Sequence, residues 1–189
     1  MAGPHIADDR RLSPTSEPSL LVERGADGID HPGGTLGAHL RRVAARLVDH
    51  GVDEATRRAG LWHAAYGTDG FPTALVGLDE RTLVAAAIGV EAEEQVYLYA
   101  SCDRSATYPG LGAPIVTFTD RFTGAAGGLP REHLRTFAAV TVANELDVVD
   151  HLALGPTRRS ALAAVLAPLR DLLTPAATED MDATLVEYP

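Results

Sequence analysis

Apolar residues recur every three or four positions through most of the chain, which is the spacing of an amphipathic helix. The pattern is clearest after Thr35, where four apolar positions follow one another at this interval: Leu36, Leu40, Val43 and Leu47. Thr35 is suited to an N-cap, and Gly51 is suited to end a helix. The pattern therefore predicts a helix from about residue 35 to residue 50.

Five further segments have helical spacing and begin or end at capping residues, proline or glycine. Their expected spans are about 54–66, 79–88, 91–104, 130–152 and 157–173. Only residues 113–119 are compatible with an extended strand. The predicted fold class is therefore all-α.

The two ends of the chain lack this periodicity. Residues 1–30 mix proline, charged residues and glycine around one short apolar patch, so we expect a flexible N-terminal arm. Residues 176–189 are expected to form a C-terminal tail, although Leu185, Val186 and Tyr188 offer apolar contacts. The helical domain is expected to span residues 31–175.

Composition limits the classes of function. The 189 residues carry a formal net charge of -10, and all sixteen basic residues are arginine. Without lysine, Schiff-base chemistry and a P-loop are excluded, and an acidic chain without a basic run is a poor ligand for nucleic acid. The single cysteine, Cys102, has no internal disulfide partner, and no apolar run has the length of a membrane span. We expect a cytoplasmic protein.

Three polar residues fall on apolar helix faces. His39 lies between Leu36 and Val43, His63 follows Trp62, and Asp103 continues a face that contains Val96 and Tyr99. Two imidazoles and one carboxylate form the facial triad typical of non-haem Fe(II). The alternative is that both histidines are hydrogen-bonded core residues and that Asp103 pairs with Arg104 or with a helix terminus.

Three stretches of the sequence resemble the HD-domain superfamily. They run from His31 to His39, through Ala-Gly-Leu-Trp-His63-Ala-Ala-Tyr66-Gly67-Thr68, and through Tyr-Leu-Tyr-Ala-Ser-Cys-Asp103-Arg104. The chain is similar more narrowly to an uncharacterised subfamily with a His-x-x-Tyr-Gly-Thr signature. The resemblance implies a bundle of about five to seven helices, with His39, His63 and Asp103 as metal ligands.

Two departures from the HD pattern affect the expected chemistry. Ala64 stands where the family has the aspartate that bridges two metals, so we expect one divalent metal ion, with Fe(II) favoured over Mn, Co or Zn. Thr68 stands where a lysine often contacts phosphate in the phosphohydrolase members, which weakens the case for phosphohydrolysis unless an arginine such as Arg104 replaces it.

Five other residues are candidates for the site. Tyr66 and His31 are predicted to take part in catalysis, and Thr68, Arg104 and Asn144 to bind substrate. The alternatives are a core tyrosine, an exposed loop histidine and, for Thr68, a capping residue.

The favoured function is therefore a mononuclear non-haem iron oxygenase that acts on a small polar metabolite. A divalent-metal hydrolase and a metal-free pocket protein are the alternatives. The expected partner is a small-molecule substrate; neither nucleic acid nor a membrane is expected, and a homodimer stays open.

Overall fold

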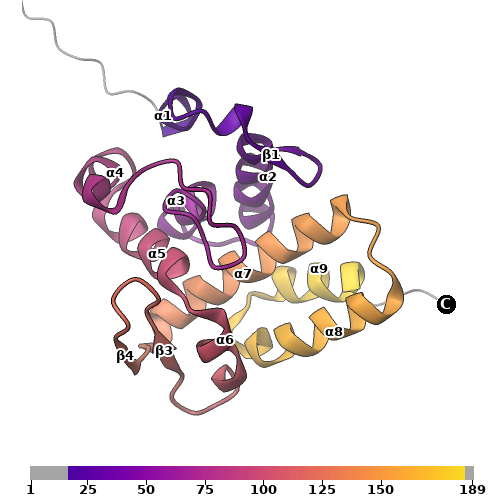
Figure 1. The fold of residues 1–189 in the computed structure, drawn as a ribbon. Helices are drawn as coiled ribbons and strands as arrows, with labels where there is room; N and C mark the ends of the chain where they lie inside the picture. Colours follow the sequence, from indigo (N-terminus) through magenta and orange to yellow (C-terminus); the bar gives the residue numbers. More distant parts are fainter. Residues whose placement is uncertain (1–16, 186–189) are drawn as a thin grey trace, which may run out of the picture.

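The computed structural model describes residues 17–185, which fold mainly as helices (Figure 1). In this range the α-helices are α1 Glu17–Glu23, α2 Leu36–Asp49, α3 Glu54–Trp62, α4 Arg81–Ile88, α5 Val90–Ser101, α6 Arg104–Thr107, α7 Arg131–His151, α8 Pro156–Leu166 and α9 Pro175–Leu185. The 3-10 segments are Ala26–Gly28, Leu78–Glu80, Tyr108–Gly110 and Ala167–Leu172. The predicted all-α class is confirmed, while an HD-like arrangement of the bundle stays a prediction.

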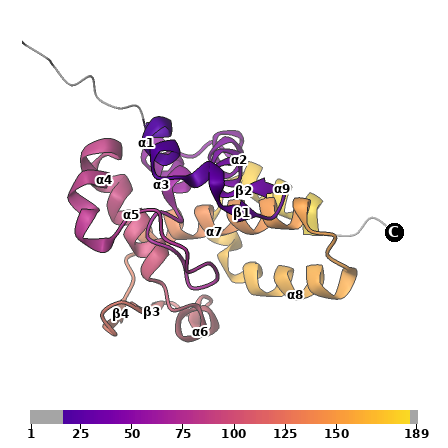
Figure 2. The same cartoon turned by 45° about the horizontal axis from the view of Figure 1, so that its top comes forward.

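Two short antiparallel hairpins accompany the helices. The first pairs β1 Asp30–His31 with β2 Gly34–Thr35, and the second pairs β3 Thr117–Thr119 with β4 Ala126–Gly128. The turned view places the first hairpin beside the C-terminal half of α7 (Figure 2). A Cβ atom added at Gly33 would lie 2.2 Å from the ring of His151, so this turn needs glycine to approach α7.

Helix α7 runs through the middle of the molecule (Figure 1). It packs against α2, α3 and α5 in the N-terminal half of the chain and against α9 in the C-terminal half. Between Leu134 and Val149 its buried residues lie on all sides of the helix. A helix in this position has no single apolar face, because neighbours cover it all round.

Helix α2 has the form that its sequence predicts. The Thr35 hydroxyl accepts a hydrogen bond from the Ala38 amide at 3.2 Å, and Gly51 follows the helix with a φ of +71°. The four apolar residues at helical spacing are fully buried: Leu36, Leu40, Val43 and Leu47. The face that carries them also carries His39 into the interior.

Parts of both end segments, residues 17–30 and 176–185, form regular structure that was not expected. Within the predicted arm, residues 17–30 include α1 and place Leu21 and Ala26 in the core. Within the predicted tail, α9 buries Ala177, Met181 and Leu185. Short apolar patches are thus sufficient here, because the 3-10 segment Ala26–Gly28 packs on α2 and α9 packs on α7. Residues 1–16 and 186–189, including the expected contacts of Val186 and Tyr188, lie outside the described residues.

No helix within residues 17–185 combines the length and the apolarity that a membrane crossing requires.

Candidate functional site

Two buried histidines from different helices meet in the interior. His39 lies on α2, and His63 lies directly after the last residue of α3. Their Nε2 atoms are 3.4 Å apart, and neither residue is more than 2% exposed. The structure therefore brings together two of the three residues that the sequence analysis predicted as metal ligands.

The other ring nitrogen of each histidine is already committed to an acceptor. Nδ1 of His63 is 2.7 Å from the Gly60 carbonyl oxygen, and Nδ1 of His39 is 2.6 Å from Oδ2 of Asp147. Because carbonyl and carboxylate oxygens only accept, both Nδ1 atoms must donate. Burial and the nearby His39 lower the pKa of His63 to about 3, so its Nε2 carries a lone pair at neutral pH.

An amide oxygen faces the same point. Oδ1 of Asn144 lies 3.0 Å from Nε2 of His39, and Nδ2 of Asn144 donates to Oε1 of Glu145 at 3.2 Å. The bond to Glu145 fixes the orientation of the amide, since a carboxylate accepts and the oxygen must then point toward His39. Two imidazole nitrogens and one amide oxygen therefore meet at one point, and their lone pairs repel one another unless a hydrogen atom or a cation lies between them.

Asp147 lies behind His39 and is almost fully buried. It also accepts two hydrogen bonds from Arg42, from Nε at 2.7 Å and from Nη2 at 2.9 Å. Burial alone would raise the pKa of Asp147, but the hydrogen bonds from His39 and Arg42 outweigh it and hold the pKa well below its ordinary value. Asp147 is therefore an ionised carboxylate that orients the His39 ring.

Asp103 does not join the two histidines, which corrects the expected triad. Helix α5 ends at Ser101, and Cys102 has extended backbone angles, so the helical face of α5 does not continue to Asp103. The Asp103 carboxylate instead caps α6, accepting from the Ala106 amide at 3.0 Å and from the Ser105 hydroxyl at 2.8 Å. Within residues 17–185, no group of three or more histidine, cysteine, aspartate or glutamate residues is arranged to hold a metal.

Tyr66 also lies away from the histidine pair, so its predicted role in catalysis is corrected. Because α3 ends at Trp62, Tyr66 does not fall one helical turn beyond His63. Its hydroxyl donates to Oε1 of Glu93 at 2.8 Å, beside Arg81. Tyr66 is a hydrogen-bonded core tyrosine, and the tyrosine in edge contact with His63 is Tyr99, with ring centroids 5.3 Å apart.

The other predicted site residues share one cavity of about 240 Å³ with His63. They come from the first hairpin, from the turn after α3, from α6 and from α7: His31, Thr68, Arg104 and Asn144. Glu145 lines the same cavity. The Thr68 hydroxyl accepts from the Phe71 amide at 3.0 Å, so its first role is to close the turn that borders the cavity.

His31 stacks on His39 with ring centroids 4.0 Å apart. Burial, together with the neighbouring His39, lowers the pKa of His31 to about 4. Its buried Nδ1 atom has no hydrogen-bond partner among the described residues. His31 is therefore a neutral imidazole at the cavity that is able to form a hydrogen bond with a polar group.

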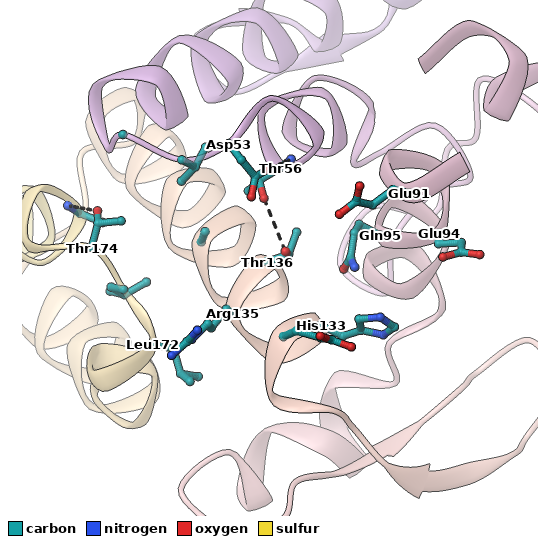
Figure 3. Close-up of a pocket in the computed structure, with 16 residues that line it drawn as sticks. Asp53, Thr56, Glu91, Glu94, Gln95, His133, Arg135, Thr136, Leu172 and Thr174 are labelled. Carbon is teal, nitrogen blue, oxygen red and sulfur yellow. Dashed lines mark hydrogen bonds between the residues drawn. The ribbon is translucent and has the colours of Figure 1, made fainter. Parts of the chain in front are cut away.

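A larger hollow, of about 590 Å³, lies elsewhere, between the start of α3, α5, α7 and the C-terminal helices (Figure 3). Glu91, Glu94 and Asp53 line it together with Arg135 and other polar groups. It contains none of the predicted site residues. Among the described residues, the histidine pair is the better candidate for chemistry, because it joins buried nitrogen donors to a cavity.

Asp147 is the main functional residue that the sequence analysis missed. Asn144 was expected to bind substrate, whereas no role was assigned to Asp147. Residues three apart on a helix are neighbours, however, and Arg42 stands at the same interval from His39 on α2. This paired spacing was the available signal.

Comparison with known proteins adds a partial match. A family described as a domain of unknown function (DUF6817) matches residues 20–104, which is less than half of the chain. The matched segment contains His39 and His63, and it also contains His31 and Arg104. It ends before α7 and so excludes Asn144 and Asp147. No curated protein and no solved structure matched.

Proposed function

We propose that the protein is a metal-dependent enzyme whose metal ion is held by His39, His63 and Asn144. The observation that carries the proposal is the meeting of two Nε2 atoms at 3.4 Å while both Nδ1 atoms are committed to acceptors. Two lone pairs repel one another at this distance unless a cation or a proton lies between them. A buried metal ion satisfies both nitrogens at once.

The donor set fits a single first-row divalent ion. Two imidazole nitrogens bound to one tetrahedral ion at about 2.0–2.1 Å lie roughly 3.3–3.4 Å apart, close to the spacing of the two Nε2 atoms. A metal-bound histidine commonly donates its second N–H to a carboxylate or a carbonyl, which is what His39 and His63 do. Ala64 offers no ligand for a second ion.

The order of the ligands along the chain supports the HD-domain resemblance. One histidine lies on an early helix and another at the end of the next, as the resemblance implies. The third position is supplied by Asn144 on α7 in place of Asp103. HD-like architecture is thus part of the proposal.

A hydrolase is favoured over an oxygenase. The facial triad of Fe(II) oxygenases needs a carboxylate ligand. Asp103 caps α6, and Asp147 is behind the His39 ring, so an amide oxygen stands in that place. A bound divalent ion would lower the pKa of a water molecule toward roughly 7 and polarise a substrate oxygen.

The chain's own groups would orient the ligands and the substrate. Asp147 keeps the His39 ring in one tautomer, and the Gly60 carbonyl does the same for His63. His31 lines the cavity and is placed to form a hydrogen bond with a polar group of the substrate. The turn from Thr68 to Phe71 borders the cavity and limits the space open to water.

The test is metal binding by the purified protein and by His63→Ala. The protein is stripped of metal, and zinc, iron(II), manganese(II) and cobalt(II) are titrated separately by calorimetry. We expect one ion per chain for wild type and loss of that site in His63→Ala, with circular dichroism showing the helical content retained. His133→Ala, a histidine on α7 away from the pair, is the matched control and should bind as wild type does.

Two outcomes would contradict the proposal. If wild type binds none of the four metals, a proton lies between the histidines and the protein is a metal-free pocket protein. If His63→Ala binds as tightly as His133→Ala, the metal site is elsewhere.

A further inference from the structure

The guanidinium of Arg104 is held at the cavity wall by aromatic rings. Its Cζ atom lies 5.7 Å from the centroid of the Tyr99 ring and 5.8 Å from that of the Tyr108 ring. Both distances are within the range of cation–π attraction. Nη2 also donates to the Tyr99 hydroxyl at 3.2 Å. Arg104 is therefore positioned before any ligand arrives.

The hydrogen-bonding capacity of Arg104 is only partly used. Its one side-chain ion pair among residues 17–185 is with Glu145, at 3.3 Å from Nη1 to Oε1. That contact is long for a charge-assisted bond, which is typically about 2.7–2.9 Å. A guanidinium has five N–H groups, and in the described part of the chain acceptors are found for two of them.

The surroundings favour an anion as the additional acceptor. Among the residues that line the cavity, Glu145 is the carboxylate that faces Arg104. Glu145 is itself partly exposed and is also bonded to the Asn144 amide. An incoming carboxylate or phosphate is able to take its place, because Arg presents a planar pair of donors that matches two oxygens of either group.

The size of the cavity limits the ligand. A volume of about 240 Å³ is below the range of roughly 300–1,000 Å³ typical of sites for drug-sized ligands. The turn after α3 also approaches closely, since a Cβ atom at Gly70 would lie 3.4 Å from Nη1 of Arg104. The space suits a small metabolite.

We propose that Arg104 binds the anionic group, a carboxylate or a phosphate, of a small substrate, and that Glu145 occupies this anion subsite until the substrate displaces it. The assignment of this anion as a substrate group rests on the proposed function, because the subsite faces the same cavity as His63 and Asn144. It can be tested without the metal, since Arg104 and Glu145 are not among the three proposed ligands and Glu145 contacts only the amide NH₂ of Asn144.

The experiment titrates inorganic phosphate, acetate and uncharged acetamide into the metal-free protein, followed by amide shifts in NMR spectra. Two substitutions should act in opposite directions. Glu145→Gln should tighten anion binding about tenfold by removing the competing charge, and Arg104→Gln should weaken it by about the same factor or abolish it. Arg158→Gln, an exposed arginine on α8, is the control, and acetamide should not bind to any of the proteins.

Phosphate and acetate distinguish the two sources of the anion, and preference for either supports the proposal. If Arg104→Gln fails to fold, Glu145→Gln and the charge-preserving Arg104→Lys decide the result. The proposal is overturned if Glu145→Gln binds neither anion, or binds them no better than wild type. It is also overturned if Arg104→Gln binds them as wild type does. Because no metal is present, these outcomes are separate from success or failure of the metal titration.

Discussion

Replacing Asp147 with asparagine removes the charge that orients His39. Asp147→Asn keeps the size of the side chain and one acceptor oxygen, but it exchanges the second carboxylate oxygen for an NH₂ donor. In the protein that carboxylate accepts from His39 Nδ1 at 2.6 Å and from Arg42 Nε and Nη2 at 2.7 and 2.9 Å. The asparagine can satisfy only part of this set.

The expected loss of stability follows from the burial of the pair. Breaking a fully buried ion pair costs about 3–5 kcal/mol. The Arg42 side chain is 29% exposed, and it also donates to the Pro32 carbonyl at 3.3 Å, so some of its solvation is retained. We therefore expect the free energy of unfolding to fall by about 3 kcal/mol. Metal affinity should fall by roughly 10–100-fold, as is typical when the partner of a ligand histidine is removed.

The assay is urea denaturation of the metal-free protein together with zinc titration of the folded protein. Asp150→Asn is the matched control, because Asp150 lies one turn later on α7 and makes a surface ion pair with Arg46 at 2.8 Å. That pair should contribute no more than about 1 kcal/mol and should not affect zinc affinity. The reasoning is refuted if Asp147→Asn resembles Asp150→Asn in both measurements.

Two further predictions concern residues outside the site. Tyr66→Phe should lower the free energy of unfolding by about 1–3 kcal/mol, because it leaves a buried Glu93 oxygen with one donor fewer. The zinc affinity should be unchanged, and a loss of zinc binding would show that Tyr66 belongs to the metal site. Burial alone would raise the pKa of Asp180, but hydrogen bonds from Arg46 and His50 outweigh it and hold the pKa below its ordinary value. The resulting stability is present above the unfolded pKa of about 3.9 and is lost as pH falls through the folded value. Asp180→Asn should therefore be less stable than wild type at pH 7, and thermal melts should show the difference shrinking in acid; a constant difference down to pH 2 would contradict this linkage.

The sequence predicted the part of the site that lies on strongly amphipathic elements. His39 falls on the buried face of α2, where apolar spacing and caps agree, and its inward direction could be read directly. His63 was also placed inward. Their meeting required tertiary packing of α2 on α3, which local spacing does not describe.

The rest of the site depends on features that local patterns do not record. Asp103 was misplaced because α5 ends at Ser101. Cys102 is extended and forms an antiparallel β-bridge with Asp120, a residue distant in the sequence. Asp147 was missed because α7 is buried on all sides. Helical periodicity assumes one buried face, and it therefore assigns to the surface some positions of α7 that are in fact interior. Helix α9 was missed because most of its apolar residues are alanines, and its packing on α7 supplies the stabilisation.

The central claim is that His39 and His63 share one ion through their Nε2 atoms, and nitrogen-15 NMR of the histidine rings tests it most directly. In the metal-free protein, both Nδ1 atoms should carry the proton. On addition of one equivalent of zinc, both Nε2 resonances should move to the range of metal-bound nitrogen while the Nδ1 protons remain. The account is contradicted if neither Nε2 resonance changes with zinc, or if His39 stays protonated on both nitrogens throughout the titration.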